Sequence, residues 1–226
     1  WYTNYTNRLA VSSDPDLDRN IYRNLGKVKK YGFDGSFAWQ PVPQLNTYVF
    51  GSYLKSEIKD DVQVGTLLIG GVGVPVLAPT AGKREAGAPV YTFGLGLQWD
   101  TKWFELGVNA KRTGRRFIYD TNEPVQTIVG GVTRSVFGAK APAYTLVDLN
   151  ARIKLDWLGL NEKTYFQLNV LNVTDNLYVG GFSPSVNQGP TYANVGGVPT
   201  VTAYGNAPNS QIGYPRTVIG SLVIGF

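Results

Sequence analysis

The stretch Val147-Asp148-Leu149-Asn150-Ala151-Arg152-Ile153-Lys154-Leu155-Asp156-Trp157 decides the fold class. Apolar residues occupy every second position, and charged or amide residues occupy the positions between them. Because successive side chains of a β-strand point to opposite faces, one face of this segment is wholly apolar and the other is strongly polar. A strand with lipid on one side and water on the other has this pattern. The stretch therefore predicts a strand of a transmembrane β-barrel.

The same alternation recurs along the chain and predicts an all-β, antiparallel fold. We expect eight strands, at roughly 1–10, 21–40, 45–59, 89–99, 103–118, 144–157, 164–175 and 214–226. Most of them exceed the roughly 9–11 residues that a tilted strand needs to cross a bilayer. The connections alternate between short turns and long loops. We expect the long loops at 11–20, 60–88, 120–143 and 176–213. Outer-membrane barrels have this arrangement, with the long loops outside the cell.

The composition argues against enzyme chemistry. The 226 residues include no Cys and no His. A Ser-His-Asp triad, a Cys nucleophile, a disulfide scaffold and a thiolate metal site are therefore excluded. We expect no catalytic residue, no cofactor and no metal site. The net charge of +5 does not favour nucleic acid as a partner, because the charges alternate in sign along the polar rows.

The tryptophans predict one edge of the membrane. Trp39, Trp99, Trp103 and Trp157 flank the short turns, and Trp1 begins a strand expected to rise from the same side. We expect all five at one level, as an interfacial aromatic girdle. The alternative is that Trp simply ends strands, as in other β proteins.

A basic cluster lies where a predicted strand reaches the long-loop side. By alternation Lys111 and Arg115 face the lumen and are candidates for a ligand path, whereas Arg112 and Arg116 face outward and are candidates for lipid headgroups. The alternative is a snorkelling interfacial collar that binds no ligand.

The last long loop adds further candidates for the ligand path. They are amide and aromatic residues suited to neutral, hydroxyl-rich ligands: Asn187, Gln188, Tyr192, Asn194 and Tyr204. The alternative interpretation is an ordinary Gly/Asn/Pro loop with turn chemistry.

The size of the barrel can be predicted from charge. The rows expected to face the lumen carry ten charged residues: Lys30, Asp34, Lys55, Glu57, Glu105, Lys111, Asp148, Arg152, Lys154 and Asp156. A closed eight-stranded barrel has an interior just wide enough for side chains, where unpaired charges are costly. The chain also begins in strand pattern. We therefore expect an open arc of a larger barrel, with the first and last strands unpaired.

Several motifs resemble the C-terminal barrel of the TonB-dependent outer-membrane receptors. They are Ala143–Leu149 with Phe166–Tyr178, Asn24–Val28 with Tyr31–Gly35, Pro215-Arg216 opening the last strand, and Phe226 closing it. The resemblance covers residues 1–226 as one domain. One departure is Thr174-Asp175-Asn176, where the family usually has a basic residue after the Asp.

The resemblance implies a barrel of about 22 strands, of which these are the last eight, around a plug domain that this chain lacks. It implies a receptor in the outer membrane of a Gram-negative cell, importing a siderophore, cobalamin or oligosaccharide with energy from TonB. The expected partners are TonB through the plug, outer-membrane lipid and lipopolysaccharide, and the barrel-assembly machinery, which would read Phe226. The alternatives are a self-contained eight-stranded barrel acting as an adhesin or anchor, and an outer-membrane barrel enzyme.

Overall fold

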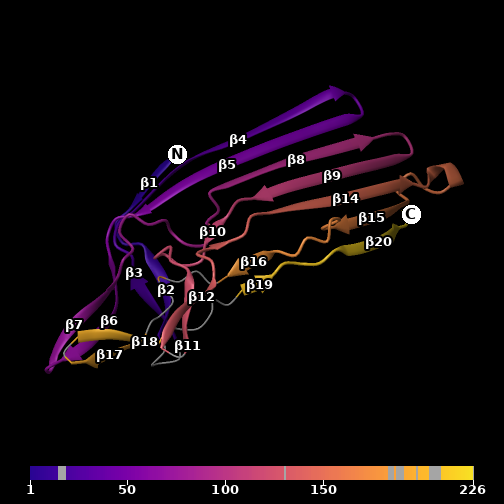
Figure 1. The fold of residues 1–226 in the computed structure, drawn as a ribbon. Helices are drawn as coiled ribbons and strands as arrows, with labels where there is room; N and C mark the ends of the chain where they lie inside the picture. Colours follow the sequence, from indigo (N-terminus) through magenta and orange to yellow (C-terminus); the bar gives the residue numbers. More distant parts are fainter. Residues whose placement is uncertain are drawn as a thin grey trace.

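A computed structural model of the chain describes residues 1–14, 19–129, 131–182, 186, 191–196, 198–203 and 210–225. Its main element is one antiparallel sheet of eight strands (Figure 1). In order across the sheet they are β1 (Tyr2–Tyr5), β4 (Val28–Val42), β5 (Leu45–Ile58), β8 (Tyr91–Asp100), β9 (Phe104–Thr113), β14 (Tyr144–Lys154), β15 (Tyr165–Leu171) and β20 (Thr217–Val223). Each of the eight predicted segments contributes one of these strands, so that prediction is confirmed.

The register gives the sheet two chemically different faces. Leu149 lies opposite Val108, whereas Arg152 lies opposite Glu105. We call the face of Leu149 the apolar face and the face of Arg152 the polar face. The apolar face also carries Phe33, Phe37, Val49, Phe93, Leu95 and Leu106. These six side chains are exposed in the chain alone, as expected of a face that lipid covers.

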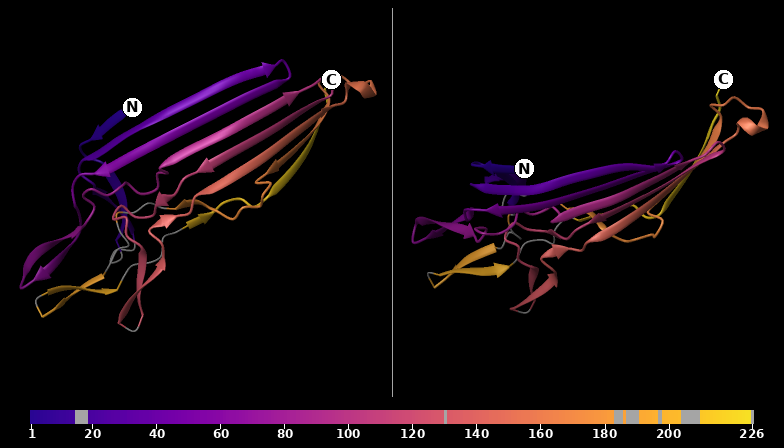
Figure 2. Two further views of the ribbon diagram at one scale, coloured as in Figure 1. Left: turned by 45° about the horizontal axis from the view of Figure 1, so that its top comes forward. Right: turned by 90° about the horizontal axis from the view of Figure 1, so that it is seen from above.

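The sheet is open. β1 and β20 form its two edges, and within the described residues they do not pair with each other. Figure 2 shows the sheet as a curved arc rather than a closed ring. The predicted open arc is confirmed, and the eight strands do not form a self-contained barrel.

Several predicted segments are shorter in the sheet than expected, and two of them are divided between the sheet and a hairpin. Segment 1–10 divides into β1 and β2 (Leu9–Asp14), and segment 21–40 divides into β3 (Arg19–Asn24) and β4. The second division lies at Leu25-Gly26, where Leu25 is buried and Gly26 has a φ of +67°. That backbone conformation suits glycine and interrupts a strand.

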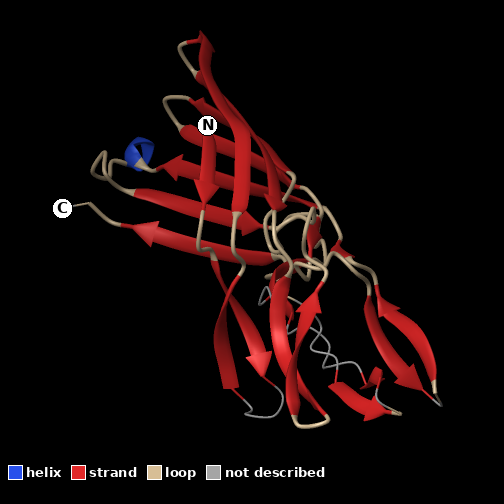
Figure 3. Cartoon of the chain, turned by 90° about the vertical axis from the view of Figure 1, so that its left-hand side faces the viewer, coloured by secondary structure: helices blue, strands red, loops and turns tan. Residues whose placement is uncertain are grey.

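The long connections are predicted to be loops, but in the structure they contain pairs of antiparallel strands (Figure 3). They are β2 with β3, β6 (Val62–Ile69) with β7 (Val72–Ala78), β11 (Val125–Val129) with β12 (Val132–Phe137), β16 (Val179–Phe182) with β19 (Ser210–Ile212), and β17 (Thr191–Val195) with β18 (Val198–Ala203). At the β6–β7 turn, Gly70 and Gly71 both have positive φ. Such a two-residue turn matches the twist of a hairpin, and a Gly-Gly pair between apolar runs is the signal that predicts one.

The short connections lie at the opposite end of the sheet. The longest of them contains the 3₁₀ turn η1 (Asp156–Leu158). Within the described part of the chain, no helix is long and apolar enough to cross a membrane.

The buried apolar residues gather where the long connections leave the sheet. One cluster joins the ends of β4 and β5 to the bases of the hairpins, and its members are Leu25, Val28, Ile58, Val62, Ala78 and Val186. A second contains Ile118, Tyr119 and Val125, with Phe182 packed against it. A single-layered sheet cannot bury a core between layers, so this small core joins the connections to one another.

Four of the five tryptophans lie at the short-turn end, as predicted, and are exposed. Trp1 does not. Its carbonyl accepts the N–H of Gly32, and its indole N–H donates to Asp34 Oδ2 (2.5 Å), which places it on the polar face. Trp39, at the short-turn end, lies seven residues after Gly32 along β4 and is roughly 23 Å from it. The prediction for Trp1 is wrong because β1 pairs with the first half of β4, from Val28 to Tyr31.

The facing predicted for Lys55 and Glu57 is also wrong. Tyr31 lies opposite Lys55, and Phe33 lies opposite Tyr53. Since Phe33 is on the apolar face, Lys55 and Glu57 share that face with it and are not in the lumen.

The two faces predict opposite effects of one substitution at neighbouring positions. Val108→Arg in the complete receptor places a charge on the lipid-covered face near the middle of β9 and is expected to destabilise the barrel by about 2–4 kcal/mol in phospholipid vesicles. Asn109→Arg, on the polar face, is the matched control and is expected to change stability little. Urea unfolding followed by Trp fluorescence measures both. Equal losses for the two variants would contradict the assignment of faces.

Candidate functional site

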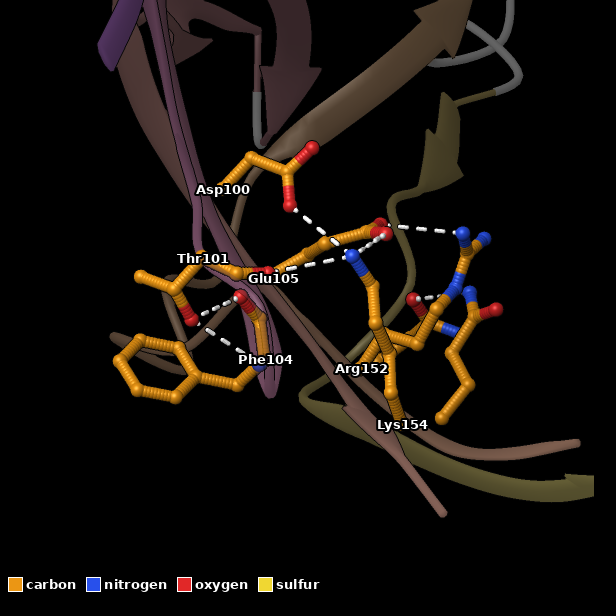
Figure 4. A network of polar contacts seen from close by, with 8 residues as sticks. Asp100, Thr101, Phe104, Glu105, Arg152 and Lys154 are labelled. Atoms are coloured by element: carbon orange, nitrogen blue, oxygen red, sulfur yellow. Dashed lines mark hydrogen bonds and ion pairs between the residues drawn. The ribbon is translucent and has the colours of Figure 1, made fainter. Parts of the chain in front are cut away.

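An ion network covers the polar face at the short-turn end (Figure 4). Glu105 Oε2 lies 3.0 Å from Arg152 Nη1, and Glu105 Oε1 lies 3.4 Å from Lys154 Nζ. Lys154 Nζ also lies 3.2 Å from Asp100 Oδ1, and the Arg152 guanidinium stacks on the Tyr165 ring at 4.3 Å. The charges of three adjacent strands are thus paired laterally, and this end of the face forms a stable wall.

Amide side chains occupy the middle of the polar face, and Gly107 makes room for them. Gln98 and Asn150 lie on either side of Gly107 in the register. A Cβ at Gly107 would lie 2.2 Å from Asn150 Oδ1 and 2.6 Å from Gln98 Oε1. Any larger residue there would displace both amides. These amides offer uncharged hydrogen-bond donors and acceptors to any molecule or domain that faces them.

At the long-loop end, Arg116 occupies an aromatic cradle. Its guanidinium lies 5.6 Å from the centre of the Tyr144 ring and 5.2 Å from that of Phe182. Its Nη1 and Nη2 donate to the carbonyls of Gly180 (3.2 Å) and Val179 (2.5 Å). Arg116 is only 7% exposed, and in the described part of the chain no carboxylate lies within ion-pair distance of it.

The predicted outward position of Arg116 is therefore wrong. The ladder of β9 ends at Thr113, and the Gly114 N–H donates to the Tyr91 carbonyl. Arg116 belongs to a separate short strand, β10 (Arg116–Phe117), which pairs with β13 (Lys140–Ala141). Alternation counted from β9 does not continue across this break. Arg116 lies over Tyr144 on the polar side and is not available to lipid headgroups.

The other three basic candidates are placed as follows. Lys111 is exposed on the polar face opposite Leu146, and Arg115 is exposed between β9 and β10. Arg112 is on the apolar face, where its Nη1 donates to Thr145 Oγ1 (2.9 Å). Thr145 also lines a hollow of about 420 Å³ at the end of β14. That hollow opens on the apolar side, so it is not part of a ligand path through the lumen.

Most candidates of the last loop are not placed. Asn187, Gln188 and Tyr204 lie outside the described residues, as does Phe226. Tyr192 and Asn194 belong to the backbone of β17, in a hairpin with β18. Their role as ligand contacts stays a prediction.

A buried acidic pair, which no sequence pattern indicated, lies beneath the long connections. Glu85 is 8% exposed and forms ion pairs with Arg8 Nε (2.8 Å) and with Lys30 Nζ. Asp120 is 3% exposed and accepts the Ala86 N–H through Oδ1 (2.6 Å). The partners are separated by 34 to 77 residues, so no local pattern predicts these contacts.

The same region ties two long connections together. Asn122 Oδ1 accepts the Arg84 N–H (2.8 Å), Asn122 Nδ2 donates to the Arg84 carbonyl (2.8 Å), and the Gly87 N–H donates to the Phe117 carbonyl (2.9 Å). A third connection joins them, because the Thr121 N–H donates to the Val186 carbonyl. The bases of the long connections therefore form one hydrogen-bonded layer over the end of the sheet.

This layer contains a carboxyl group that titrates near neutral pH. Burial raises the pKa of Asp120 to about 7, and the negative charge of Glu85 acts in the same direction. The Ala86 N–H and the charges of Arg8 and Lys30 act against it. Burial also raises the pKa of the adjacent Tyr119 to about 12.

Comparison with known families gives one match. The protein-family model described as TonB dependent receptor-like, beta-barrel, matches residues 1–177. No curated protein matches the chain.

Solved structures of siderophore receptors share the fold. The siderophore receptor PiuA from Acinetobacter baumannii is 17% identical, with 98% of this chain and 24% of that chain covered and a TM-score of 0.59. The ferric yersiniabactin uptake receptor FyuA from Yersinia pestis is 15% identical, with 88% and 24% covered and a TM-score of 0.56. A mutant of the ferric enterobactin receptor PfeA from Pseudomonas aeruginosa is 16% identical, with 100% and 28% covered and a TM-score of 0.52. The chain spans about a quarter of the length of these receptors.

The titration of Asp120 predicts how the loop layer responds to pH. The folded pKa of about 7 lies above the usual Asp pKa of 3.8, so ionisation disfavours the folded layer. The protonated Asp120 carboxyl contributes its full stabilisation of the folded layer below about pH 4. This contribution to the free energy of unfolding, on the order of 4 kcal/mol in total, is lost as the pH rises to about 7. Hydrogen exchange of the Ala86 and Thr121 amides, corrected for intrinsic rates, is expected to be faster at pH 8 than at pH 5.

Asp120→Asn is the control, because its Oδ1 retains the acceptor for Ala86 while the group no longer ionises. It should keep the amides protected at pH 8. A wild-type protein with pH-independent protection would refute the assignment.

Proposed function

Because this chain belongs to the TonB-dependent receptor β-barrel family, we propose that it forms part of the wall of a receptor that binds an anionic ferric siderophore and imports it. Members of this family are transport receptors of the Gram-negative outer membrane and not enzymes. Import of this kind needs a binding surface and a path, with no covalent chemistry in the wall.

The charge at the long-loop end supports an anionic ligand. Arg116 is a buried guanidinium with no carboxylate partner among the described residues, and Lys111 and Arg115 are exposed and lie within five residues of it in sequence. A charge that is held away from water stabilises an anion strongly when one approaches. The aromatic rings of Tyr144, Tyr178 and Phe182 border this region, and the Tyr144 and Tyr178 ring centres lie 4.4 Å apart.

The solved neighbours support the siderophore class over the other nutrients of the family. PiuA is a siderophore receptor by name, and FyuA is by name a ferric yersiniabactin uptake receptor. Cobalamin and oligosaccharides are largely neutral, so they would make little use of the unpaired cations. The amides of the last loop fit an oligosaccharide better, which makes that class the second candidate.

The polar face fits a role as a support for an internal domain. Its short-turn end has charges that are paired within the sheet, and its middle has amides. Such a surface can contact a plug through hydrogen bonds without leaving buried charges unpaired. Energy from TonB would reach the ligand through that plug and not through these strands.

Binding by the complete receptor tests the proposal. Lys111→Gln with Arg115→Gln removes two exposed cations and is expected to weaken binding of ferric enterobactin, or of the ferric siderophore that binds best in a panel, about tenfold. Lys102→Gln with Lys163→Gln removes two exposed lysines at the short-turn end and should leave affinity unchanged. Quenching of intrinsic fluorescence gives the dissociation constants.

Two outcomes would contradict the proposal. One is equal affinity in both double variants, since the cations would then have no part in binding. The other is binding of a neutral maltooligosaccharide and of no ferric siderophore, which would favour the second candidate.

An aromatic residue after β20 makes a separate prediction about assembly. Phe226 follows the apolar residues Val218, Leu222 and Ile224, which lie on alternate positions, and it resembles the aromatic residue by which the barrel-assembly machinery recognises a strand. Phe226→Ala in the complete receptor should lower its abundance in the outer membrane, whereas Phe226→Tyr should preserve it. Heat-modifiable mobility of membrane fractions on gels measures the assembled form. Unchanged abundance of the Phe226→Ala variant would exclude this role.

A further inference from the structure

The Arg116 side chain joins two of the long connections. Arg116 belongs to β10, in the connection between β9 and β14. The two carbonyls that accept from it, those of Val179 and Gly180, belong to β16, in the connection between β15 and β20. The bonded residues are 63 and 64 positions apart in sequence. The guanidinium is therefore a bridge between two segments that no local pattern connects.

The two accepting carbonyls lie at an irregularity of β16. This strand pairs with β19 through Val179 and Gly181, and the register shifts between these two residues, so Gly180 has no partner on β19. Such a bulge bends its strand and interrupts the ladder of hydrogen bonds. Arg116 donates to the carbonyls on either side of this interruption. It therefore holds β16 at the point where the strand bends.

Packing alone would not require an arginine at this position. Arg116 is only 7% exposed, and among the described residues its Nε has no hydrogen-bond partner. Burying a guanidinium that lacks a carboxylate is costly, so an apolar side chain would fill the space between the Tyr144 and Phe182 rings at lower cost. What an apolar side chain could not do is donate to the two carbonyls of β16. The directed hydrogen bonds are the distinctive contribution of Arg116.

β16 leads to a hairpin that lies among the other long connections. Farther along the chain, β17 lies beside β6, and β18 lies beside β11 (Figure 1). The β17–β18 hairpin carries Tyr192 and Asn194, which are two of the candidate ligand contacts. The bend of β16 sets the direction in which the chain leaves the sheet toward this hairpin.

We propose that Arg116 is a positioning residue: it fixes the bend of β16 and thereby places the β17–β18 hairpin relative to its neighbours. A guanidinium suits this role, because its planar fork donates to two carbonyls at once while its face contacts aromatic rings. A lysine ammonium has the same charge but not this geometry. The consequence for ligand binding rests on the proposed function, whereas the placement of the hairpin does not.

The distance between two spin labels on the complete receptor tests the placement. Val72 begins β7 and Val195 ends β17, and both are more than half exposed. Each is changed to Cys and labelled, in a receptor without other cysteines, and pulsed electron paramagnetic resonance gives the distribution of distances. We expect one narrow distribution with Arg116 and a broader, shifted one in the Arg116→Ala variant.

Three controls separate the fork from charge and from general disturbance. Arg134→Gln removes an exposed arginine of β12 and should leave the distribution narrow. Arg116→Lys keeps the charge and should stay broad. Free guanidinium ion should restore the narrow distribution in the Arg116→Ala variant, because it can enter the space between the rings, whereas sodium chloride at the same ionic strength should not. Heat-modifiable mobility on gels shows that each variant is folded.

Two results would overturn the positioning role. One is an unchanged distribution in both Arg116→Ala and Arg116→Lys. The other is full recovery in Arg116→Lys or in sodium chloride, since charge alone would then be sufficient.

Ligand binding tests the consequence for the receptor. Arg116→Ala is expected to weaken binding of ferric enterobactin, or of the ferric siderophore that binds best in a panel, about tenfold. Guanidinium ion should restore the affinity, and Arg116→Lys should not. Full affinity in Arg116→Lys would instead assign a direct electrostatic role, and full affinity in Arg116→Ala would overturn the link to the ligand. If the wild type binds no ferric siderophore, the proposed function fails, and the spin-label distances still decide the role of Arg116.

Discussion

In a membrane, every backbone N–H and C=O of a strand needs a partner within the protein, because hydrocarbon offers none. The rest of this structure depends on that constraint. β14 satisfies it through β9 on one side and β15 on the other, and the ladder with β9 runs from Tyr144 to Ile153. β1 and β20 each have a neighbour on one side only. The sheet therefore requires further strands at both edges, which the barrel of the family supplies.

A single sheet between lipid and lumen also determines where a core can form. Among the described residues, no second layer covers either face, so apolar burial is confined to the end where the connections cross one another. Val28 and Ile58 are fully buried there, beside Val186 from a connection more than 120 residues away in sequence. The hydrogen bonds of Asn122 and Asp120 join the same connections. The long connections thus form one layer, and a change at one of them reaches the others.

The two ends of the sheet differ in how they hold charge. At the short-turn end, Glu105 pairs with Arg152 and Lys154 inside the face. At the long-loop end, four cations have no acidic partner among the residues that the structure describes: Arg116 and Lys111 on the polar side, and Lys29 and Lys55 on the apolar side. The paired charges at the short-turn end stabilise that part of the barrel wall. The cations at the long-loop end attract anions that come from outside the chain. Lateral pairing is possible near the short turns because they hold adjacent strands in fixed register.

Local alternation predicted the strands and most of their faces, since a strand in a lipid–water boundary has its side chains sorted at every second position, and the charge of the polar rows predicted the open arc. For Leu149 and Arg152, the alternation of neighbouring residues is enough to predict the face on which each side chain lies. The prediction failed wherever the ladder ends or the partner strand matters. Arg116 follows a break at Gly114, Trp1 depends on which half of β4 receives β1, and Lys55 follows the register of Phe33 with Tyr53.

The sequence by itself thus determined the class of fold, the membrane-facing side of strands such as β9 and β14, and the absence of catalytic chemistry based on Cys or His. Only the tertiary structure decided which distant groups meet. Glu85 with Arg8, and Asp120 with Ala86, come together because connections separated by many residues converge over one end of the sheet. Periodicity is a property of neighbours along the chain and contains no information on such contacts. The long-range packing of the connections determines the burial and the charge of the site.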